Sequence, residues 1–197
     1  MKQYNVLICG VGGQGVMSLG MLLKSAALPE GKKVLGFEMR GLSQMEGAVT
    51  SSVRYMYGED SEETDERKAM HSGSVPYGGT DLLIALEALE AIRNAPLLSR
   101  DTIIILNTYT ICPREVEYPD VSAIIENLKK ITDKVYVLDA NELSMERYGS
   151  YRMANAMLLG AALEHSDLPI RRETIEGLLS STQEREALDL GMNYIFE

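Results

Sequence analysis

The fold is decided by the stretch Tyr4-Asn5-Val6-Leu7-Ile8-Cys9-Gly10-Val11-Gly12-Gly13-Gln14-Gly15, which leads into Val16 to Leu28. A short apolar run that ends in glycines predicts a strand followed by a tight turn. Apolar residues then recur at helical spacing, which predicts a helix directly after the turn. A strand, a glycine turn and a helix in this order are typical of the first unit of a doubly wound α/β sheet.

The turn itself has the pattern G-x-G-x-x-G between Gly10 and Gly15. Backbone N–H groups at the start of the following helix would face an anion such as a phosphate or carboxylate. Glu38 closes the next predicted strand 23 residues after Gly15, where a dinucleotide site would place its ribose-binding acid. We expect Gly13 to lie where the backbone closely approaches the helix start. Two interpretations stay open: anion or cofactor binding, and glycines that serve only the turn and the packing of helix on strand.

The rest of the chain alternates between apolar runs of strand length and helical patterns. Strands are predicted at 33–38, 48–57, 82–86, 102–106 and 134–138, and helices at 87–95 and 121–131. The continuous apolar runs 82–86 and 102–106 are typical of strands buried on both faces of a parallel sheet. From Asn141 onward the sequence is mostly helical, with breaks predicted near Gly149, Pro169 and Gly191. The predicted fold class is α/β: a doubly wound, Rossmann-like, mostly parallel sheet with a helical C-terminal part, in one domain over 1–197.

Composition excludes several classes of protein. Of the 197 residues 45% are hydrophobic and 24% are charged, which predicts a globular domain with its own core. Lys and Arg number 19 and Asp and Glu number 29, so the formal charge is −10 and a nucleic-acid binder is not expected. The uncharged run 5–23 contains five glycines and an amide, which excludes a membrane span.

The two cysteines, Cys9 and Cys112, are far apart and belong to no C-x-x-C pair. They predict reduced thiols and a cytoplasmic location, and they cannot form an iron–sulfur or zinc site on their own. His71 and His165 have no neighbours at ligand spacing, so we expect surface or capping roles and no metal site.

Motifs in order along the chain resemble one family. They are G-x-G-G-Q-G-V at 10–16, Glu38 to Val49 with Val53-Arg54, Val75 to Leu83, Leu86 to Ala91, Asn107-Thr108 with Pro113, and Arg152 to Gly160. The chain resembles the gamma-type domain of 2-oxoacid:ferredoxin oxidoreductases. Within that family the likeness is greatest to the small (beta) subunits of the indolepyruvate type.

This resemblance implies oxidative decarboxylation of a 2-oxoacid to an acyl-coenzyme A, with electrons passed singly to ferredoxin. Thiamine diphosphate, Mg²⁺, iron–sulfur clusters and coenzyme A would be held on or with a large partner subunit. The chain would bind no cofactor alone, carry no catalytic residue of its own and be inactive without its partner. The implied substrate is an aryl or branched 2-oxoacid, ferredoxin would be an indirect partner, and a homodimer of the isolated chain is left open.

The predicted cofactor-binding residues are the glycine turn and the polar residues that the motifs place near it. They are Gly10, Gly12, Gly13, Gln14, Gly15, Glu38, Arg40, Gln44, Arg54 and Asn107. Arg40 is the favoured base, because it lies where a strand ends and a loop begins. The family commonly has Gln-Arg-Gly-Gly where this chain has Gln-Met-Glu-Gly at 44–47, and this change of charge weakens the expected attraction for an anion.

Two other classes of function stay open from the sequence. A free-standing dinucleotide-binding oxidoreductase would use the same glycines and Glu38, although no Tyr-x-x-x-Lys set for hydride transfer is present. A non-catalytic scaffold subunit with a Rossmann-like core would bind no ligand at all.

Overall fold

The computed structural model describes residues 2–41, 47–58, 72–112 and 117–196. Within these ranges the strands are β1 (Lys2–Val11), β2 (Lys33–Arg40), β3 (Ala48–Tyr57), β4 (Leu82–Ala85), β5 (Ile103–Asn107) and β6 (Val135–Leu138). They form one sheet in the order β2-β3-β1-β4-β5-β6. β3 runs antiparallel to both of its neighbours, and every other pairing is parallel. The predicted α/β class with a mostly parallel sheet is confirmed.

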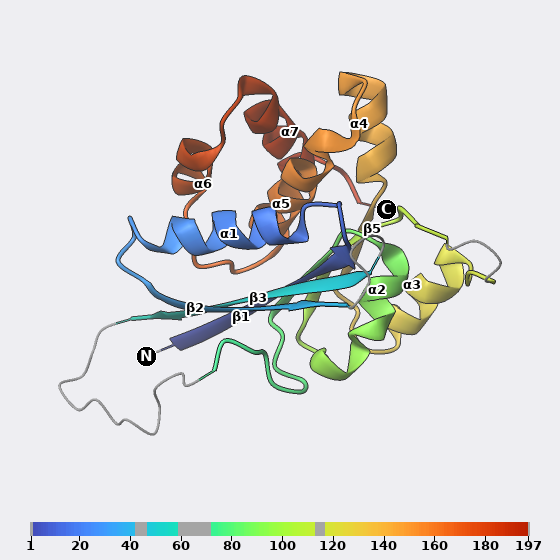
Figure 1. The fold of residues 1–197 in the computed structure, drawn as a ribbon, viewed down its shortest axis with the longest axis horizontal. Helices are drawn as coiled ribbons and strands as arrows, with labels where there is room; N and C mark the ends of the chain where they lie inside the picture. The colour runs from blue at the N-terminus through green and yellow to red at the C-terminus, as the bar shows by residue number, and fades with distance from the viewer. Residues whose placement is uncertain (1, 42–46, 59–71, 113–116, 197) are drawn as a thin grey trace.

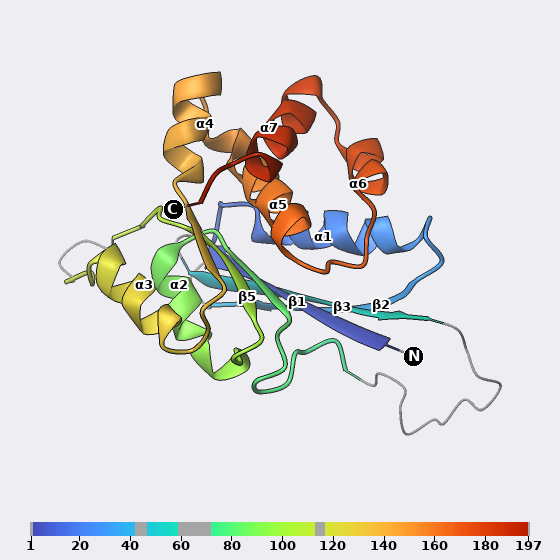
Figure 2. The same cartoon turned by 180° about the vertical axis from the view of Figure 1, so that it is seen from behind.

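Helices cover both faces of this sheet. They are α1 (Val16–Ala27), α2 (Ala88–Arg93), α3 (Val121–Lys129), α4 (Ala140–Tyr148), α5 (Ala154–His165), α6 (Arg172–Leu178) and α7 (Thr182–Met192), with short 3-10 turns η2 (Ala95–Leu97) and η3 (Tyr151–Met153). Figures 1 and 2 show α1 and the C-terminal helices on one side of the sheet and α2 and α3 on the other. The predicted helical C-terminal part is confirmed.

β1 is buried on both faces and joins the two halves of the core. Val6 and Ile8 belong to the larger apolar cluster, beneath α1, α5 and α7, whereas Leu7 and Cys9 belong to a second cluster with α2 and α3. In β3 successive side chains alternate between the two faces, and Val53 and the neighbouring odd-numbered residues 49 and 55 pack into the larger cluster.

The predicted boundaries hold to within about two residues, and two of the differences have a clear physical reason. The second strand continues to Arg40 because it pairs with β3 along its whole length. The helix predicted at 87–95 ends at Arg93, since Pro96 lies in the first turn of η2 and cannot continue an α-helix.

The three breaks predicted in the C-terminal part are confirmed. Gly149 ends α4 with a φ of 66°, and Pro169 lies between α5 and α6, as expected. α7 ends at Met192, so a break does fall near Gly191, as predicted, although Gly191 itself still lies in the last turn of the helix. A Cβ there would lie 1.9 Å from the Met157 carbonyl oxygen, so this glycine permits close packing of α7 on α5.

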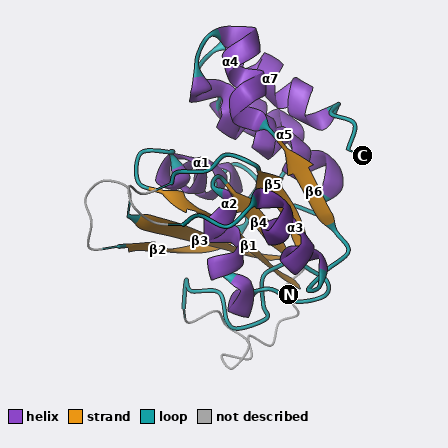
Figure 3. Ribbon diagram, turned by 90° about the vertical axis from the view of Figure 1, so that its right-hand side faces the viewer, coloured by secondary structure: helices purple, strands orange, loops and turns teal. Residues whose placement is uncertain are grey.

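The connections leave β1 and β4 in opposite directions. The chain passes from β1 through α1 to β2 on one side, and from β4 through α2 to β5 on the other. The β1–β4 boundary is therefore the switch point of the sheet, and in open α/β sheets ligands bind outside the carboxyl ends of the strands at such a point. The end-on view in Figure 3 shows the order of the strands across this boundary.

Candidate functional site

The glycine turn after β1 is closed by the side chain of Gln14. Val11 N donates to Gln14 Oε1 at 2.7 Å, and Gln14 Nε2 donates to the Leu86 carbonyl at 3.1 Å. The amide therefore ties the end of β1 to the residue that follows β4. Gln14 was predicted to bind a cofactor, and both polar atoms of its side chain make hydrogen bonds inside the protein that hold the turn in place.

The glycines of the turn have different roles. A Cβ at Gly10 would lie 2.7 Å from Gln14 Oε1, and one at Gly15 would lie 2.7 Å from Asn155 Nδ2, so both positions are crowded. Gly13 has open space around it, and the close approach predicted there is wrong. Glycine is favoured at position 13 because the backbone there has a φ of 99°, which other residues rarely adopt. The same holds for Gly15, whose φ is 88°.

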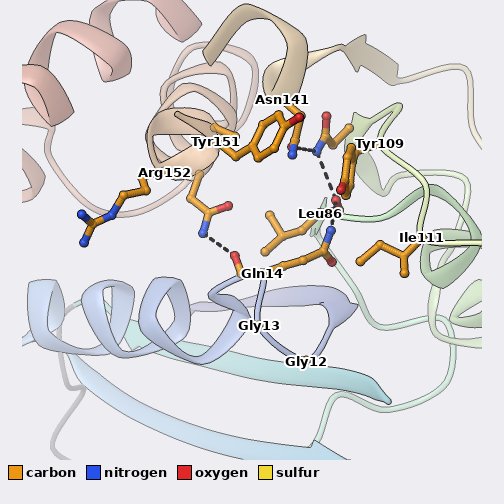
Figure 4. A pocket seen from close by; sticks show the side chains of 12 residues that line it. Gly12, Gly13, Gln14, Leu86, Tyr109, Ile111, Asn141, Tyr151 and Arg152 are labelled. Atoms are coloured by element: carbon orange, nitrogen blue, oxygen red, sulfur yellow. Dashed lines mark hydrogen bonds between the residues drawn. The ribbon is translucent and has the colours of Figure 1, made fainter. Parts of the chain in front are cut away.

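A cleft of about 330 Å³ opens beside this turn at the β1–β4 switch point. Its lining residues come from five separate stretches of the chain and are Gly12, Gly13, Gln14, Leu86, Asn107, Tyr109, Ile111, Asn141, Tyr151, Arg152, Ala154 and Asn155. Figure 4 shows the labelled side chains around the glycine turn. None of these lining residues is Asp or Glu, although the whole chain has a formal charge of −10. The cleft is thus a polar site without the negative charge of its surroundings.

Asn107, which was predicted to bind a cofactor, lines the cleft at the end of β5. Its Nδ2 donates to the Leu86 carbonyl at 3.1 Å and to Asn141 Oδ1 at 2.8 Å, and its Oδ1 accepts from Ala140 N at 3.1 Å. These bonds use both of its polar atoms inside the protein. Asn107 therefore fixes the orientation of Asn141, whose own Nδ2 donates to no acceptor in the described ranges.

Several lining residues were missed by the sequence reasoning as members of the site. Tyr109 and Tyr151 form an aromatic pair with ring centroids 6.1 Å apart, and Asn155 Nδ2 donates to the Gln14 carbonyl at 2.8 Å. The motif that begins at Arg152 was quoted for the family resemblance and contains Asn155, so it was the available signal.

Arg152 is the cation of this cleft. Its guanidinium has no hydrogen bond or ion pair with any other described residue, and it is exposed at the rim. Figure 4 shows its side chain extending away from Asn141 and Tyr151. A cation that no described residue neutralises is available to an anionic ligand or a partner protein.

The outer wall of the cleft is anchored by Glu87, which is buried. Its carboxylate accepts from Glu90 N at 2.9 Å, from Ile111 N at 3.2 Å and from the Tyr118 hydroxyl. Burial and this hydrogen bond raise the pKa of Tyr118, so the phenol stays protonated and keeps donating. One carboxylate thus caps α2 and also fixes the segment that carries Tyr109 and Ile111.

A second, more open hollow of about 610 Å³ lies against other residues of the same turn and contains Arg40. Its lining is Val11, Gly12, Gly13, Gly15, Val16, Met17, Ser18, Arg40, Gly41 and Val49. Gly12 N donates to the Gly47 carbonyl at 2.9 Å, which joins the glycine turn to the start of β3. The predicted base Arg40 is therefore beside the glycines, but in a different hollow from Asn107.

Glu38 lines neither hollow. Its Oε1 lies 2.8 Å from Lys24 Nζ, so it forms an ion pair with α1. A dinucleotide-binding sheet places the strand of the ribose-binding acid directly beside the first strand. Here β3 lies between β2 and β1, so Glu38 is one strand too far away, and the geometry does not support its predicted ribose role.

Arg54 is not at the site. Arg54 pairs with Asn5 near the start of β1, at the end of the strand opposite the glycine turn. Its guanidinium donates to Asn5 Oδ1 at 2.8 Å and to the carbonyls of Ser72 and Ser74, so its donors are used inside the protein. Gln44 lies outside the described residues, as does the altered charge at 45 and 46.

The described residues contain no cluster of three or more His, Cys, Asp or Glu side chains that could hold a metal ion. In the same ranges no helix is long and apolar enough to cross a membrane. His165 stacks on Tyr136 with ring centroids 4.3 Å apart and packs against Phe196, which is a packing role. Burial raises the pKa of the Cys9 thiol, so that cysteine is an inert part of the core.

Comparison with known proteins agrees with the fold and the motifs. Residues 5–195 match the family model described as pyruvate ferredoxin/flavodoxin oxidoreductase. An indolepyruvate oxidoreductase subunit IorB from Archaeoglobus fulgidus is 32% identical, over 95% of this chain and 90% of its own. The pyruvate/ketoisovalerate oxidoreductases common subunit gamma of Pyrococcus abyssi is 25% identical, over 88% and 83%.

Solved structures share the fold at lower identity. Pyruvate oxidoreductase subunit PORC from Thermotoga maritima superposes with a TM-score of 0.65 at 20% identity, over 97% of this chain and 96% of that one. A 2-oxoglutarate:ferredoxin oxidoreductase from Magnetococcus marinus gives a TM-score of 0.69 at 18% identity, over 98% of this chain and 31% of that one.

The fold and the glycine-lined cleft thus define a Rossmann-like subunit of the 2-oxoacid:ferredoxin oxidoreductase type. The chain belongs to the pyruvate ferredoxin/flavodoxin oxidoreductase family. The family resemblance inferred from its motifs is confirmed.

Proposed function

We propose that this chain is the small subunit of a cytoplasmic 2-oxoacid:ferredoxin oxidoreductase that converts an aryl or branched 2-oxoacid to its acyl-coenzyme A. The chain supplies a ligand-binding cleft, and a larger subunit holds thiamine diphosphate, Mg²⁺ and the iron–sulfur clusters. The observation that carries this proposal is the cleft itself, in which backbone groups of Gly12 and Gly13, amide side chains and Arg152 converge without a carboxylate.

The donor set of the cleft fits an anionic organic ligand. Gly13 and its neighbours lie at the start of α1, where N–H groups and the helix dipole favour negative charge. Arg152 and the Nδ2 of Asn141 add further donors at the rim and floor. Coenzyme A carries phosphates and a 2-oxoacid carries a carboxylate, so each offers the charge that this donor set favours.

The same donor set does not fit thiamine diphosphate as a ligand of this chain alone. Mg²⁺ requires oxygen ligands and is commonly held by carboxylates, and no Asp or Glu lines the cleft. Thiamine diphosphate supplies an electron sink for the decarboxylation when it is bound. In our proposal the residues of this chain bind and orient the anion at that centre, and they transfer no proton.

The substrate class follows from the walls of the cleft and from the relatives. Tyr109, Tyr151, Ile111 and Leu86 provide aromatic and aliphatic surface beside the amides. Relatives about 30% identical over most of the chain are indolepyruvate oxidoreductase subunits. Both observations favour a 2-oxoacid with a large apolar side chain.

The two alternative functions are less well supported. A dinucleotide site would need Glu38 beside the glycines. Its carboxylate is instead paired with Lys24, and β3 separates its strand, β2, from β1. A scaffold that binds nothing would have no need of a polar cleft from which carboxylates are absent.

The test is turnover of the complex reconstituted with the large subunit, measured with a panel of 2-oxoacids and with coenzyme A as the varied ligand. We expect the highest kcat/KM with aryl or branched 2-oxoacids. Arg152→Gln should raise the KM of one anionic ligand about fivefold with little change in kcat. Arg100→Gln is the matched control, because Arg100 is exposed at the opposite end of the sheet. Equal activity with every 2-oxoacid, or equal effects of the two variants, would contradict the proposal.

A further inference from the structure

The edge strand β2 carries an exposed row of apolar side chains. Leu35, Phe37 and Met39 are 37%, 49% and 57% exposed, and their spacing of two residues places them on one face of the sheet. The residues between them face α1: Val34 packs against the larger core cluster, and Glu38 pairs with Lys24. Edge strands are commonly protected by charged side chains, so an apolar row of this kind indicates a contact surface.

Of the described residues, the loop before β4 reaches only part of this row. Arg54, the β3 partner of Leu35, donates to the carbonyls of Ser72 and Ser74, and a Cβ at Gly73 would lie 2.4 Å from the Gly36 carbonyl oxygen. Phe37 and Met39 stay about half exposed beyond this loop. The second core cluster, on the same side of the sheet, is built from β1, β4, β5 and β6 with α2 and α3, and it includes no residue of β2 or β3. Figure 3 shows α2 and α3 beside β4 and β5 and no helix beneath β2. On β3 the partners of Phe37 and Met39 are Ser52 and Thr50, whose side chains are too short to cover these two residues.

A second copy of this chain is a poor occupant for the row. Each copy has a formal charge of −10, so two identical chains repel each other over their whole surface. β2, in contrast to the chain as a whole, is positively charged at both ends, where Lys33 and Arg40 are exposed. A partner that fits this strand would offer an apolar patch with carboxylates near both ends.

We infer that this β2 row, made of Leu35, Phe37 and Met39, is where the larger subunit of the complex docks. This inference rests on the proposed function. The same fold is found in a solved chain of which it forms only 31%, so in that protein much additional structure accompanies this unit. Met39 directly precedes Arg40, which lines the open hollow on the glycine turn. The hollow opens on the α1 face and the row lies on the opposite face, so the proposed docking surface borders the hollow only at the edge of β2 and is separate from the glycine turn.

The test compares Phe37→Glu with Tyr77→Glu. Both replace an exposed aromatic residue with the same charge, and Tyr77 is 85% exposed on a loop before β4. Binding of each purified chain to the separately purified large subunit is measured by calorimetric titration, with the melting temperature of each free chain as a check on folding. We expect Phe37→Glu to weaken binding at least roughly tenfold and Tyr77→Glu to change it by less than about twofold. Phe37→Ser, which adds no charge, should weaken binding in the same direction.

The outcomes separate this inference from the function on which it rests. If the unaltered chain does not bind the large subunit, the proposed function fails. If it binds and both Phe37 variants bind equally well, the docking surface is overturned and the proposed function stands. If the free chain dimerises and Phe37→Glu abolishes only that dimer, the occupant is a second copy and the inference is likewise overturned.

Discussion

Asn155 Nδ2 donates to the backbone carbonyl of Gln14 at 2.8 Å, although the two residues are 141 positions apart. The bond fixes the start of α5 against the glycine turn before α1. The same Nδ2 lies 2.7 Å from the place where a Cβ at Gly15 would be, so the contact also requires a glycine there. The cleft therefore depends on the C-terminal helices as much as on the N-terminal motif.

Asn155→Ala should loosen this contact. We expect a loss of about 1 kcal/mol in the free energy of unfolding, because the Gln14 carbonyl loses a partly buried hydrogen bond. The KM of the ligand in the reconstituted complex should rise about threefold, since the turn is less well fixed. Denaturant unfolding and steady-state kinetics measure the two effects.

The control for this variant is Asn127→Ala. Asn127 donates to the Ala123 carbonyl at 2.9 Å on the exposed face of α3, far from the turn. Its replacement should change stability by less than about 0.5 kcal/mol and leave KM unchanged. A rise in KM with both variants would show that Asn155 has no special role at the turn.

Gly13→Val and Gly58→Val form a matched pair. The two glycines have φ values of 99° and 102°, so a β-branched residue is similarly strained at each. We expect similar losses of stability, about 1 to 3 kcal/mol, in the isolated chains. Only Gly13→Val should lower the kcat/KM of the complex, because Gly13 lines the cleft, whereas Gly58 directly follows β3 and does not line it. Equal kcat/KM values for the two reconstituted variants would count against the site.

Glu30 gives the fold a defined dependence on acid. Its carboxylate is 3% exposed, and it pairs with Lys32 and accepts from Arg171 N at 2.8 Å. Burial raises the pKa of Glu30, but the hydrogen bonds from Lys32, Thr174 and the Arg171 backbone outweigh it and lower the pKa from 4.5 to about 2. A folded pKa below the ordinary value means that the carboxylate stabilises the fold above pH 4.5 and loses this effect as the pH falls towards 2.

The wild-type chain should accordingly exceed Glu30→Gln in stability by about 3 kcal/mol near neutral pH. We expect this difference to shrink between pH 4.5 and 2. Unfolding is measured with denaturant at each pH, and Glu126→Gln, at an exposed position of α3, is the control. A difference that stays constant through this range would contradict the pKa of about 2.

Glu87 is predicted to position the outer wall of the cleft. In Glu87→Gln one carboxylate oxygen becomes an NH₂ group, which cannot accept a hydrogen bond. The side chain then accepts from only one of the Ile111 and Glu90 backbone N–H groups. We expect KM to rise several-fold with kcat little changed. Tyr118→Phe removes only the hydroxyl donor to Glu87 and should have a smaller effect in the same direction. A loss of kcat at constant KM would assign Glu87 a different role.

The sheet was predictable where its strands are continuous apolar runs, as in β4 and β5. The position of β3 was not, because it depends on pairing between distant strands. Val6 pairs with Val53, and this contact inserts β3 between β1 and β2. A local pattern carries no information about such a partner, so Glu38 was expected beside the glycines and lies one strand away.

The site divides in the same way. The glycine turn and Asn107 could be predicted, because each directly follows a strand and lies at the edge where ligands bind. Asn141 and Asn155 reach the cleft from C-terminal helices, and only the folded chain brings them there. The internal role of Gln14 was also hidden, since an amide in a glycine turn can face a ligand or its own backbone, and the sequence is the same in both cases.

The central claim is that this chain completes the active complex without being active itself. The most direct measurement titrates the chain into the purified large subunit under anaerobic conditions and follows 2-oxoacid-dependent reduction of ferredoxin in the presence of coenzyme A. The account predicts a colourless isolated chain, no turnover from this chain alone, and a rate that rises and saturates at a fixed ratio of the two subunits. Full activity of the large subunit alone, or turnover by this chain alone, would contradict it.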